Sequence, residues 1–253
     1  MIRISFCTYL IRKDWDLEKL AKVAKEAGYD GVEPRTDMGM KHRLSVGFRD
    51  EPRTSAEEIE KAIKLFRDAG VSFASIATGV QFSSADPQVR KRNVEEAKEY
   101  IKLADQLGAK VVRVFSGRVP PRVRRVEAVD YVVKCLNEVG RFAKDYDVSP
   151  LMEQHDDWDH TVDLCDVMKK VTEEREGVLW NQTTIDGQSF ELLKDRLKHF
   201  HIHDSSPAIL ETMRLLKTID FDGYLSLEVG SQPNPEQFLK DHAVRTRNYL
   251  KQL

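Results

Sequence analysis

Eight short apolar runs, each followed by a longer segment of helical periodicity, constrain the fold of this chain more than any other feature. No composition break or linker separates the eight pairs within the 253 residues. Because strands that alternate with helices are typical of a parallel sheet, the pattern predicts an α/β fold, a (β/α)8 TIM barrel formed by residues 1–253 as a single domain. We expect strands at 2–7, 31–33, 71–77, 109–115, 148–153, 177–181, 199–203 and 223–228, and helices at 16–27, 55–69, 87–107, 121–146, 158–172, 188–197, 207–217 and 235–250.

Composition limits the partners and the setting. The chain has 40 basic and 42 acidic residues and a net charge of -2, which weighs against nucleic acid as the main partner. Its three cysteines, Cys7, Cys135 and Cys165, are odd in number and far apart, so a disulfide framework is not expected and a reducing compartment is. No apolar run approaches ~18 residues, and the first residues do not resemble a leader. We therefore expect a soluble cytoplasmic protein with no membrane contact; a homo-oligomer stays open.

The run from Lys198 to Asp204 reads Lys-His-Phe-His-Ile-His-Asp. Alternation at period two places His199, His201 and His203 on one face of a strand. Three imidazoles in register beside an acid suggest a metal site or a site of proton transfer. The alternative is a strand whose histidines are ordinary hydrogen-bonded polar residues.

Polar residues collect where the predicted strands end, and in a barrel of this type those ends carry the chemistry. Glu153 and Glu228 each close an apolar strand, where a buried carboxylate is costly without a cation or a partner. Two acids and a histidine suit a divalent metal, Mn²⁺ or Mg²⁺, with Co²⁺ or Zn²⁺ also tolerated. The alternative is a structural ion network of the two glutamates with Arg113 and Arg35. The full set at the strand ends is Glu33, Arg35, Arg113, Glu153, His155, Asn181, His201, Asp204 and Glu228.

These residues resemble the xylose isomerase-like barrels of the sugar phosphate isomerase and epimerase group, which include the ketose 3-epimerases and inosose dehydratases. The resemblance covers nearly the whole chain, from Ile-Ser-Phe and Gly-Val-Glu to Leu-Met-Glu-Gln-His, His-Phe-His-Ile-His-Asp and Gly-Tyr-Leu-Ser-Leu-Glu. It implies a metal held by Glu153, Asn181, His201 and Glu228, and it singles out the middle histidine of the strand.

The chain departs from the family pattern at the sixth strand. Members commonly carry Trp-Asp-x-x-His there, whereas this sequence reads Trp-Asn-Gln-Thr-Thr from Trp180 to Thr184. Asparagine keeps an oxygen donor but removes a negative charge, so we expect a metal to be held more weakly and to stay a stronger Lewis acid. Thr184 stands where the family histidine would contact substrate.

The resemblance implies a metal-dependent isomerase or epimerase, or a related dehydratase, that acts on a sugar, sugar acid or sugar phosphate through an enediolate. Glu153 and Glu228 would be the paired acid and base, with a metal on the carbonyl and a neighbouring hydroxyl oxygen. His155 fits a substrate contact or the mere start of a loop, and Arg113 fits a phosphate or carboxylate of an anionic substrate. The expected substrate-binding set is Glu33, Arg35, Arg113, His155 and Asp204.

Residues 34–54 have little periodicity, and so long a loop in a compact domain is typically functional or disordered, so we expect a lid over the site. Two other functions stay open. One is a non-catalytic or metal-poor carbohydrate-binding barrel. The other, less favoured, is an endonuclease at abasic DNA sites, which needs a three-zinc cluster and a basic groove that the sequence does not show.

Overall fold

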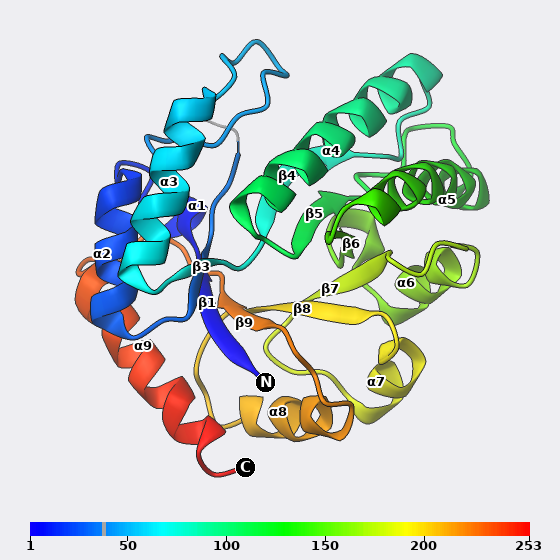
Figure 1. Cartoon of the computed structure of the whole chain (residues 1–253). Coiled ribbons are helices and arrows are strands. Elements are labelled where there is room, and N and C mark those ends of the chain that lie inside the picture. Colours follow the sequence, from blue (N-terminus) through cyan, green and yellow to red (C-terminus); the bar gives the residue numbers. More distant parts are fainter. Residues whose placement is uncertain (37–38) are drawn as a thin grey trace.

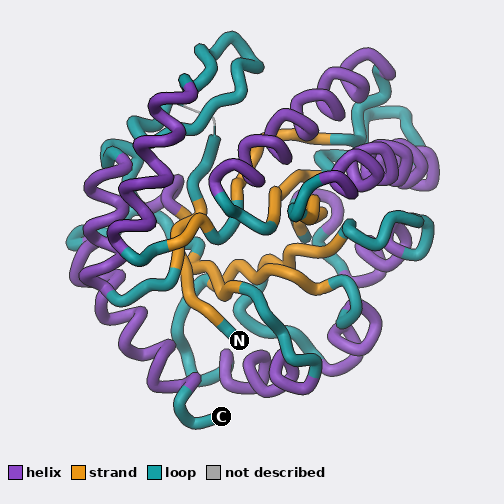
Figure 2. The backbone as a smooth tube through the Cα atoms, viewed as in Figure 1, coloured by secondary structure: helices purple, strands orange, loops and turns teal. Residues whose placement is uncertain are grey.

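A ring of parallel strands with helices outside it forms the protein (Figures 1 and 2). The computed structural model describes residues 1–36 and 39–253. Within these residues one sheet has the strand order β3-β2-β1-β9-β8-β7-β6-β5-β4, and every paired neighbour is parallel. A parallel bridge between Arg35 and Ala77 links the two ends of the sheet, next to a hydrogen bond from Thr36 N to Ala77 O of 3.2 Å. The predicted barrel fold is confirmed.

The strands and helices follow the predicted order. The strands are β1 (Arg3–Cys7), β2 (Gly31–Glu33), β3 (Ser72–Phe73), β4 (Ile76–Gln81), β5 (Val111–Phe115), β6 (Ser149–Glu153), β7 (Gly177–Asn181), β8 (Leu197–Ile202) and β9 (Tyr224–Leu227). The helices are α1 (Thr8–Ile11), α2 (Leu17–Ala27), α3 (Ala56–Ala69), α4 (Pro87–Leu107), α5 (Arg125–Phe142), α6 (Thr161–Met168), α7 (Gly187–Leu193), α8 (Ile209–Thr218) and α9 (Pro235–Leu250), with short 3-10 turns at Ala143–Asp145 and Asp156–Trp158.

The third predicted strand is in fact two strands. β3 pairs with β2, whereas β4 pairs with β5, so the chain bends at Ala74 and Ser75 as it passes from one neighbour to the other. Several helices also differ: α5 ends at Phe142 rather than at 146, α6 spans Thr161–Met168 rather than 158–172, and α7 ends at Leu193 rather than at 197. The short α1 was not predicted, and the fifth helix begins at Arg125 rather than at residue 121. Both Pro120 and Pro121 lie before it, in a turn that contains the left-handed residue Arg122.

Local signals explain why the helices begin and end where they do. The predicted capping box at Ser55 is present, since its side chain accepts from Glu58 N and the Glu58 side chain accepts from Ser55 N. Asp16 and Asp86 cap α2 and α4 with their side chains alone, which accept from Lys19 N and Gln88 N, and Pro87 opens α4. Gly108 ends α4 at a φ of 74°, a conformation that costs glycine least.

Alternation along the strands separates two environments. Residues such as Ile4 and Phe6 of β1 pack into the main core under the helices, whereas Cys7 contacts residues of β8 and β9 across the barrel. Val111, Leu151 and Leu179 form a separate small apolar cluster from three adjacent strands. Glu153 ends β6 two residues after Leu151, and Asn181 ends β7 two residues after Leu179. These polar side chains therefore lie next to the apolar cluster, on its carboxyl-end side. Within the described residues, no helix combines the length and the apolar character that a bilayer span requires.

Candidate active site

His201, on β8, is the centre of a buried polar cluster at the carboxyl ends of the strands. Its Nδ1 atom lies 2.9 Å from Oε1 of Glu153 and 3.3 Å from Oε2 of Glu228. Its Nε2 atom lies 3.0 Å from Oε1 of Glu33 and 3.6 Å from Sγ of Cys7. The imidazole is fully buried, and only Glu228, with 20% of its side chain exposed, reaches solvent. The predicted convergence of Glu153, His201 and Glu228 is therefore what the structure shows.

Strand register brings these residues together. His201 is opposite Asn181 of β7 and Ser226 of β9, and Glu153 ends β6 opposite Leu179. The backbone N–H of Glu228 donates to Ile202 O at 2.8 Å, which fixes the residue directly after β9. Parallel pairing of β6 to β9 thus aligns the strand ends that carry the two acids with the histidine.

Charge and burial set the ionisation of the cluster. Burial raises the pKa of Glu33, but the charges of His201 and His199 and the hydrogen bonds to their rings hold it well below its usual value. Burial lowers the pKa of His201, but the charges of Cys7, Glu33 and Glu228 outweigh that effect and raise it well above its usual value. Burial, followed by the charge of Glu33, raises the pKa of the Cys7 thiol to about 12. Cys7 is then neutral near pH 7, so the carboxylates sustain the shift of His201.

Glu228 responds to the same charges. Burial raises its pKa, but the charge of His201 and the hydrogen bond to it lower the pKa to about 2. Glu228 is therefore a carboxylate near pH 7 and faces a ring nitrogen that lies between two acids. This arrangement requires positive charge at Nδ1 of His201, which a proton or a cation can supply.

Part of the alternative ion network is also present. Arg113 Nη1 lies 3.1 Å from Oε2 of Glu153, with both side chains almost fully buried. Asn181 Nδ2 donates to Oε1 of Glu153 at 3.1 Å. Arg35 instead lies over the rings of Tyr9 and Phe115, at 4.8 and 5.7 Å. One glutamate is thus held by an arginine and an asparagine.

Among residues 1–36 and 39–253, two groups could hold a metal ion, and they lie on opposite sides of the His201 ring. The first is Glu153, His201 and Glu228, and the second is Cys7, Glu33 and His201. In the described part of the chain, His201 Nδ1, Glu153 Oε2 and Asn181 Oδ1 are buried atoms without a hydrogen-bond partner. Both carboxylate oxygens of Glu33, in contrast, have a hydrogen-bond partner. The unpartnered atoms lie on the Nδ1 side, so the oxygen-rich group fits a hard divalent cation better.

Charge balance agrees with a single ion. Glu33, Glu153 and Glu228 contribute three negative charges, Arg113 contributes one positive charge, and the two imidazoles are neutral when a metal is bound. One divalent cation would therefore neutralise the cluster.

Three other polar residues at the strand ends differ from what the sequence suggested: Asp204 and His203 lie outside the buried cluster, and Glu33 lies within it. Asp204 is exposed, and its carboxylate accepts from Ser206 N at 2.9 Å, so it orders the loop after β8. His203 is also exposed and contacts the backbone oxygens of Glu228 and Asn181. It does not share the buried environment of His199 and His201 because β8 ends at Ile202. Glu33 is buried against two histidines rather than free to meet a substrate.

His155 and Arg35 remain at the mouth of the barrel. The His155 ring is 4.8 Å from Phe115, and its side chain is 45% exposed. Arg113, in contrast, is 2% exposed and contacts the same Phe115 ring at 4.0 Å. An anionic substrate group would therefore meet His155 and Arg35 before Arg113.

Sequence reasoning missed three contributors. Cys7 ends β1 and contacts His201, and the rule that collected the other strand ends would have found it. His199 lies in the predicted histidine strand, but its side-chain contact with Glu33 at 2.8 Å was missed, because it joins β2 and β8, which β1 and β9 separate in the sheet. Gln154 is buried, accepts from Asn181 N at 3.2 Å and donates to Asp159 O at 2.6 Å, so it ties the ends of β6 and β7 together.

The predicted lid contains residues 37 and 38, which lie outside the described residues. Of the remainder, His42 is fully buried, with its ring 2.7 Å from Trp15 O and 2.8 Å from Thr8 Oγ1. Arg49 pairs with Glu96 at 2.9 Å. The segment is thus anchored at several points, and movement as a whole would have to break these contacts.

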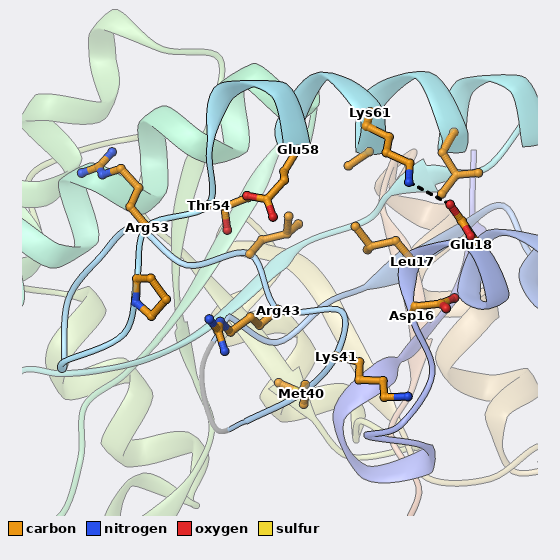
Figure 3. Close-up of a pocket in the computed structure, with 14 residues that line it drawn as sticks. Asp16, Leu17, Glu18, Met40, Lys41, Arg43, Arg53, Thr54, Glu58 and Lys61 are labelled. Carbon is orange, nitrogen blue, oxygen red and sulfur yellow. Dashed lines mark ion pairs between the residues drawn. The ribbon is translucent and has the colours of Figure 1, made fainter.

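A separate cleft of about 670 Å³ lies between α2, α3 and this segment (Figure 3). Its acidic and basic side chains are mixed, and Lys61 pairs with Glu18 at 2.9 Å across it. None of the residues of the His201 cluster lines it. The cleft is therefore distinct from the candidate active site.

Several solved structures have a similar fold. The 3-keto-D-glucoside 4-epimerase YcjR from E. coli has a similar structure, with a TM-score of 0.77 and 14% identity over 98% of each chain. The D-psicose 3-epimerase from Clostridium cellulolyticum H10, solved with D-tagatose, has a TM-score of 0.76 and 13% identity over 98% of this chain and 97% of that one. The IOLI protein, solved with a zinc atom, has a TM-score of 0.74 and 15% identity over 99% and 97%.

No curated protein matches the chain by sequence at a significant level. A family model does, however, and it matches residues 21–249 under the description xylose isomerase-like TIM barrel. This range includes every residue of the cluster except Cys7. The chain belongs to the xylose isomerase-like TIM barrel family.

Proposed function

We propose that the protein is a metal-dependent sugar isomerase or epimerase. The observation that carries the proposal is the approach of Glu153 and Glu228 to one ring nitrogen of His201, at 2.9 and 3.3 Å, in a nearly dry site. Two carboxylates can serve as acid and base on a carbon next to a carbonyl. The fold is that of epimerases that act on ketoses, and one of those was solved with D-tagatose.

A divalent cation held by Glu153, His201 and Glu228, with the Asn181 oxygen nearby, would act as a Lewis acid on the carbonyl and stabilise the negative charge that develops beside it. Mn²⁺ or Mg²⁺ fits the oxygen-rich donors, and Co²⁺ or Zn²⁺ fits the imidazole. The zinc atom in the IOLI structure is consistent with a divalent ion in this fold.

The residues themselves divide the proton transfer between them. Glu228 is ionised near pH 7 and partly exposed, so it is the group that removes the proton from the substrate carbon. Isomerisation requires Glu228 to return that proton to the neighbouring carbon. Inversion requires Glu228 to keep the proton that it removes, while Glu153, protonated from solvent before the step, delivers its own proton to the opposite face. Arg113 and Asn181 hold Glu153 in place for either outcome.

The substrate class that this site supports is a small sugar or sugar derivative. One divalent ion already balances the charges of the buried cluster, so a charged group of the substrate would have to lie outside it. At the mouth of the barrel, His155 and Arg35 lie beside the rings of Phe115 and Tyr9. Aromatic rings pack against the apolar faces of sugars. The two basic side chains can bind a carboxylate or phosphate at the end of the substrate that lies away from the metal.

A metal-poor carbohydrate-binding barrel is the second candidate. It is favoured by one observation, that Asn181 and Arg113 already engage both oxygens of Glu153 and so reduce its need for a cation. Such a barrel would keep the sugar pocket without the chemistry.

Proton exchange with solvent tests the proposal. Protein loaded with Mn²⁺ is freed of unbound ion and incubated with ketopentoses and ketohexoses in D₂O, and proton NMR then follows the signal of the carbon next to the carbonyl. We expect that signal to disappear for at least one sugar, with Glu228→Gln and Glu153→Gln slower by at least about 10²-fold. The matched control is Glu176→Gln, a fully buried glutamate outside the cluster, which should exchange at the wild-type rate. If the protein binds metal but no sugar exchanges its proton with solvent, the enzyme proposal is refuted and the carbohydrate-binding barrel remains.

A further inference from the structure

Glu33 lies on the far side of His201 from the proposed metal. Its Oε1 atom is 3.0 Å from Nε2 of His201, and its Oε2 atom is 2.8 Å from Nε2 of His199. Glu33 is 1% exposed, and both imidazoles are fully buried. The carboxylate therefore bridges two histidines that alternate on β8, without access to solvent.

The bridge fixes which ring nitrogens carry hydrogen. A carboxylate oxygen can only accept, so both Nε2 atoms that face Glu33 must donate. The Nδ1 atom of His201 is then free to point a lone pair at the side where Glu153 and Glu228 lie. The opposite tautomer would place a lone pair of Nε2 against Glu33 and an N–H where the metal is proposed.

His199 holds the bridge in place. Its ring is nearly perpendicular to that of His201, at 83° with the centroids 5.7 Å apart, so the two Nε2 atoms approach separate oxygens of the same carboxylate. Glu33 is also fixed by its backbone, since β2 pairs with β1 through Cys7 and Glu33. The carboxylate thus has little freedom to leave His201.

We propose that Glu33, held by His199, is a positioning residue that presents Nδ1 of His201 to the metal. It contacts neither substrate nor metal and acts through the imidazole, as carboxylates behind metal-bound histidines do elsewhere. The inference rests on the proposed metal site of the preceding section. It adds a role to Glu33 and His199, which the proposed mechanism leaves unused.

Titration with Mn²⁺ alone, by calorimetry and without sugar, tests the role in binding. Glu33→Gln keeps the shape of the side chain but has a single acceptor oxygen, so it cannot accept from both Nε2 atoms. We expect it to bind Mn²⁺ about 10- to 100-fold more weakly than wild type. The matched control is Glu176→Gln, which changes an equally buried glutamate that contacts neither histidine, and it should bind as wild type does. Equal affinity in Glu33→Gln and wild type, or no binding by wild type, overturns the inference.

Nitrogen NMR tests the position of the ring directly in the wild-type protein and does not depend on Glu33→Gln. Wild-type protein with ¹⁵N-labelled histidine is loaded with Zn²⁺, and the His201 signals are assigned by their loss in His201→Asn. We expect a protected hydrogen on Nε2 and none on Nδ1. A hydrogen on Nδ1 would overturn the inference, because the metal would then lie on the Cys7 side.

The two readouts separate this inference from the proposed function. Weakened Mn²⁺ binding by Glu33→Gln, with no proton exchange in any sugar, supports the positioning role and refutes the enzyme. Proton exchange by wild type together with full Mn²⁺ affinity in Glu33→Gln refutes the positioning role and keeps the enzyme.

Discussion

Replacement of Asn181 by aspartate should make the protein depend on metal more strongly. Asn181 Nδ2 donates to Oε1 of Glu153 at 3.1 Å, so Asn181→Asp replaces this hydrogen bond with two carboxylates in contact. At that distance and an effective dielectric constant of about 20, their repulsion is of the order of 5 kcal/mol if both stay ionised. Sharing a proton between the two acids, or the nearby charge of Arg113, reduces the cost, so we expect about 2–4 kcal/mol.

A bound cation should offset part of this cost. The variant offers one more negative charge to the metal at nearly the same volume, so Mn²⁺ affinity should rise about tenfold or more, which is about 1.4 kcal/mol. A domain of this size shifts its melting temperature by about 2–4 °C per kcal/mol. The metal-free variant should therefore melt several degrees below wild type, and saturating Mn²⁺ should narrow that difference by about 3–6 °C.

The assay is calorimetric titration with Mn²⁺, together with melting curves in chelator and in excess Mn²⁺. Asn93→Asp is the matched control, because Asn93 is also buried and donates Nδ2 to a backbone oxygen, that of Gln81. It should lose stability, and Mn²⁺ should stabilise it only as much as it stabilises wild type. Should Asn181→Asp fold but show no more stabilisation by Mn²⁺ than Asn93→Asp, the metal site at His201 is refuted.

Three further predictions concern stability and the lid. Burial raises the pKa of Glu176 well above its usual value, so the stability that its neutral form contributes is full below about pH 4.5 and is lost as pH rises toward the folded pKa. Glu176→Gln should therefore stabilise the protein at pH 7, by about 1.4 kcal/mol for each unit by which the pKa is raised. Urea unfolding measures the difference. Burial, helped by the charge of Arg245, lowers the pKa of His242 to about 4, so stability present above about pH 6.5 should fall by about 3 kcal/mol as pH drops to 4, and His242→Gln should flatten that slope. Hydrogen exchange in residues 34–54 should be faster than in the strands and slow down with bound substrate, and equal exchange with and without a sugar that binds would show that the segment is only structural.

Much of the fold could be predicted because it depends on local signals. Apolar runs of five or six residues, capping residues such as Ser55, and the glycine after α4 predicted the order and most of the boundaries. The bend between β3 and β4 could not be predicted, because the sequence does not show that Ala74 and Ser75 mark a change of pairing partner. The short α1 carries no capping side chain and was missed for that reason.

The candidate site divides in the same way. Glu153, His201 and Glu228 could be selected because each ends an apolar strand, and a barrel brings strand ends together. Glu33 was selected in the same way, but as a substrate contact; its contact with His201, 168 positions away in the sequence, could not be predicted. Asp204 was chosen for its place beside the histidines, but β8 ends before it and its side chain orders a loop.

The location of a bound ion tests the account most directly. Crystals of the protein grown with Mn²⁺ would show the ion through its anomalous scattering. We expect one strong peak on the Nδ1 side of His201, within ligand distance of Glu153 and Glu228. A peak on the Nε2 side beside Cys7 and Glu33 would contradict the account. So would the absence of a peak, with Arg113 and Asn181 still in contact with Glu153.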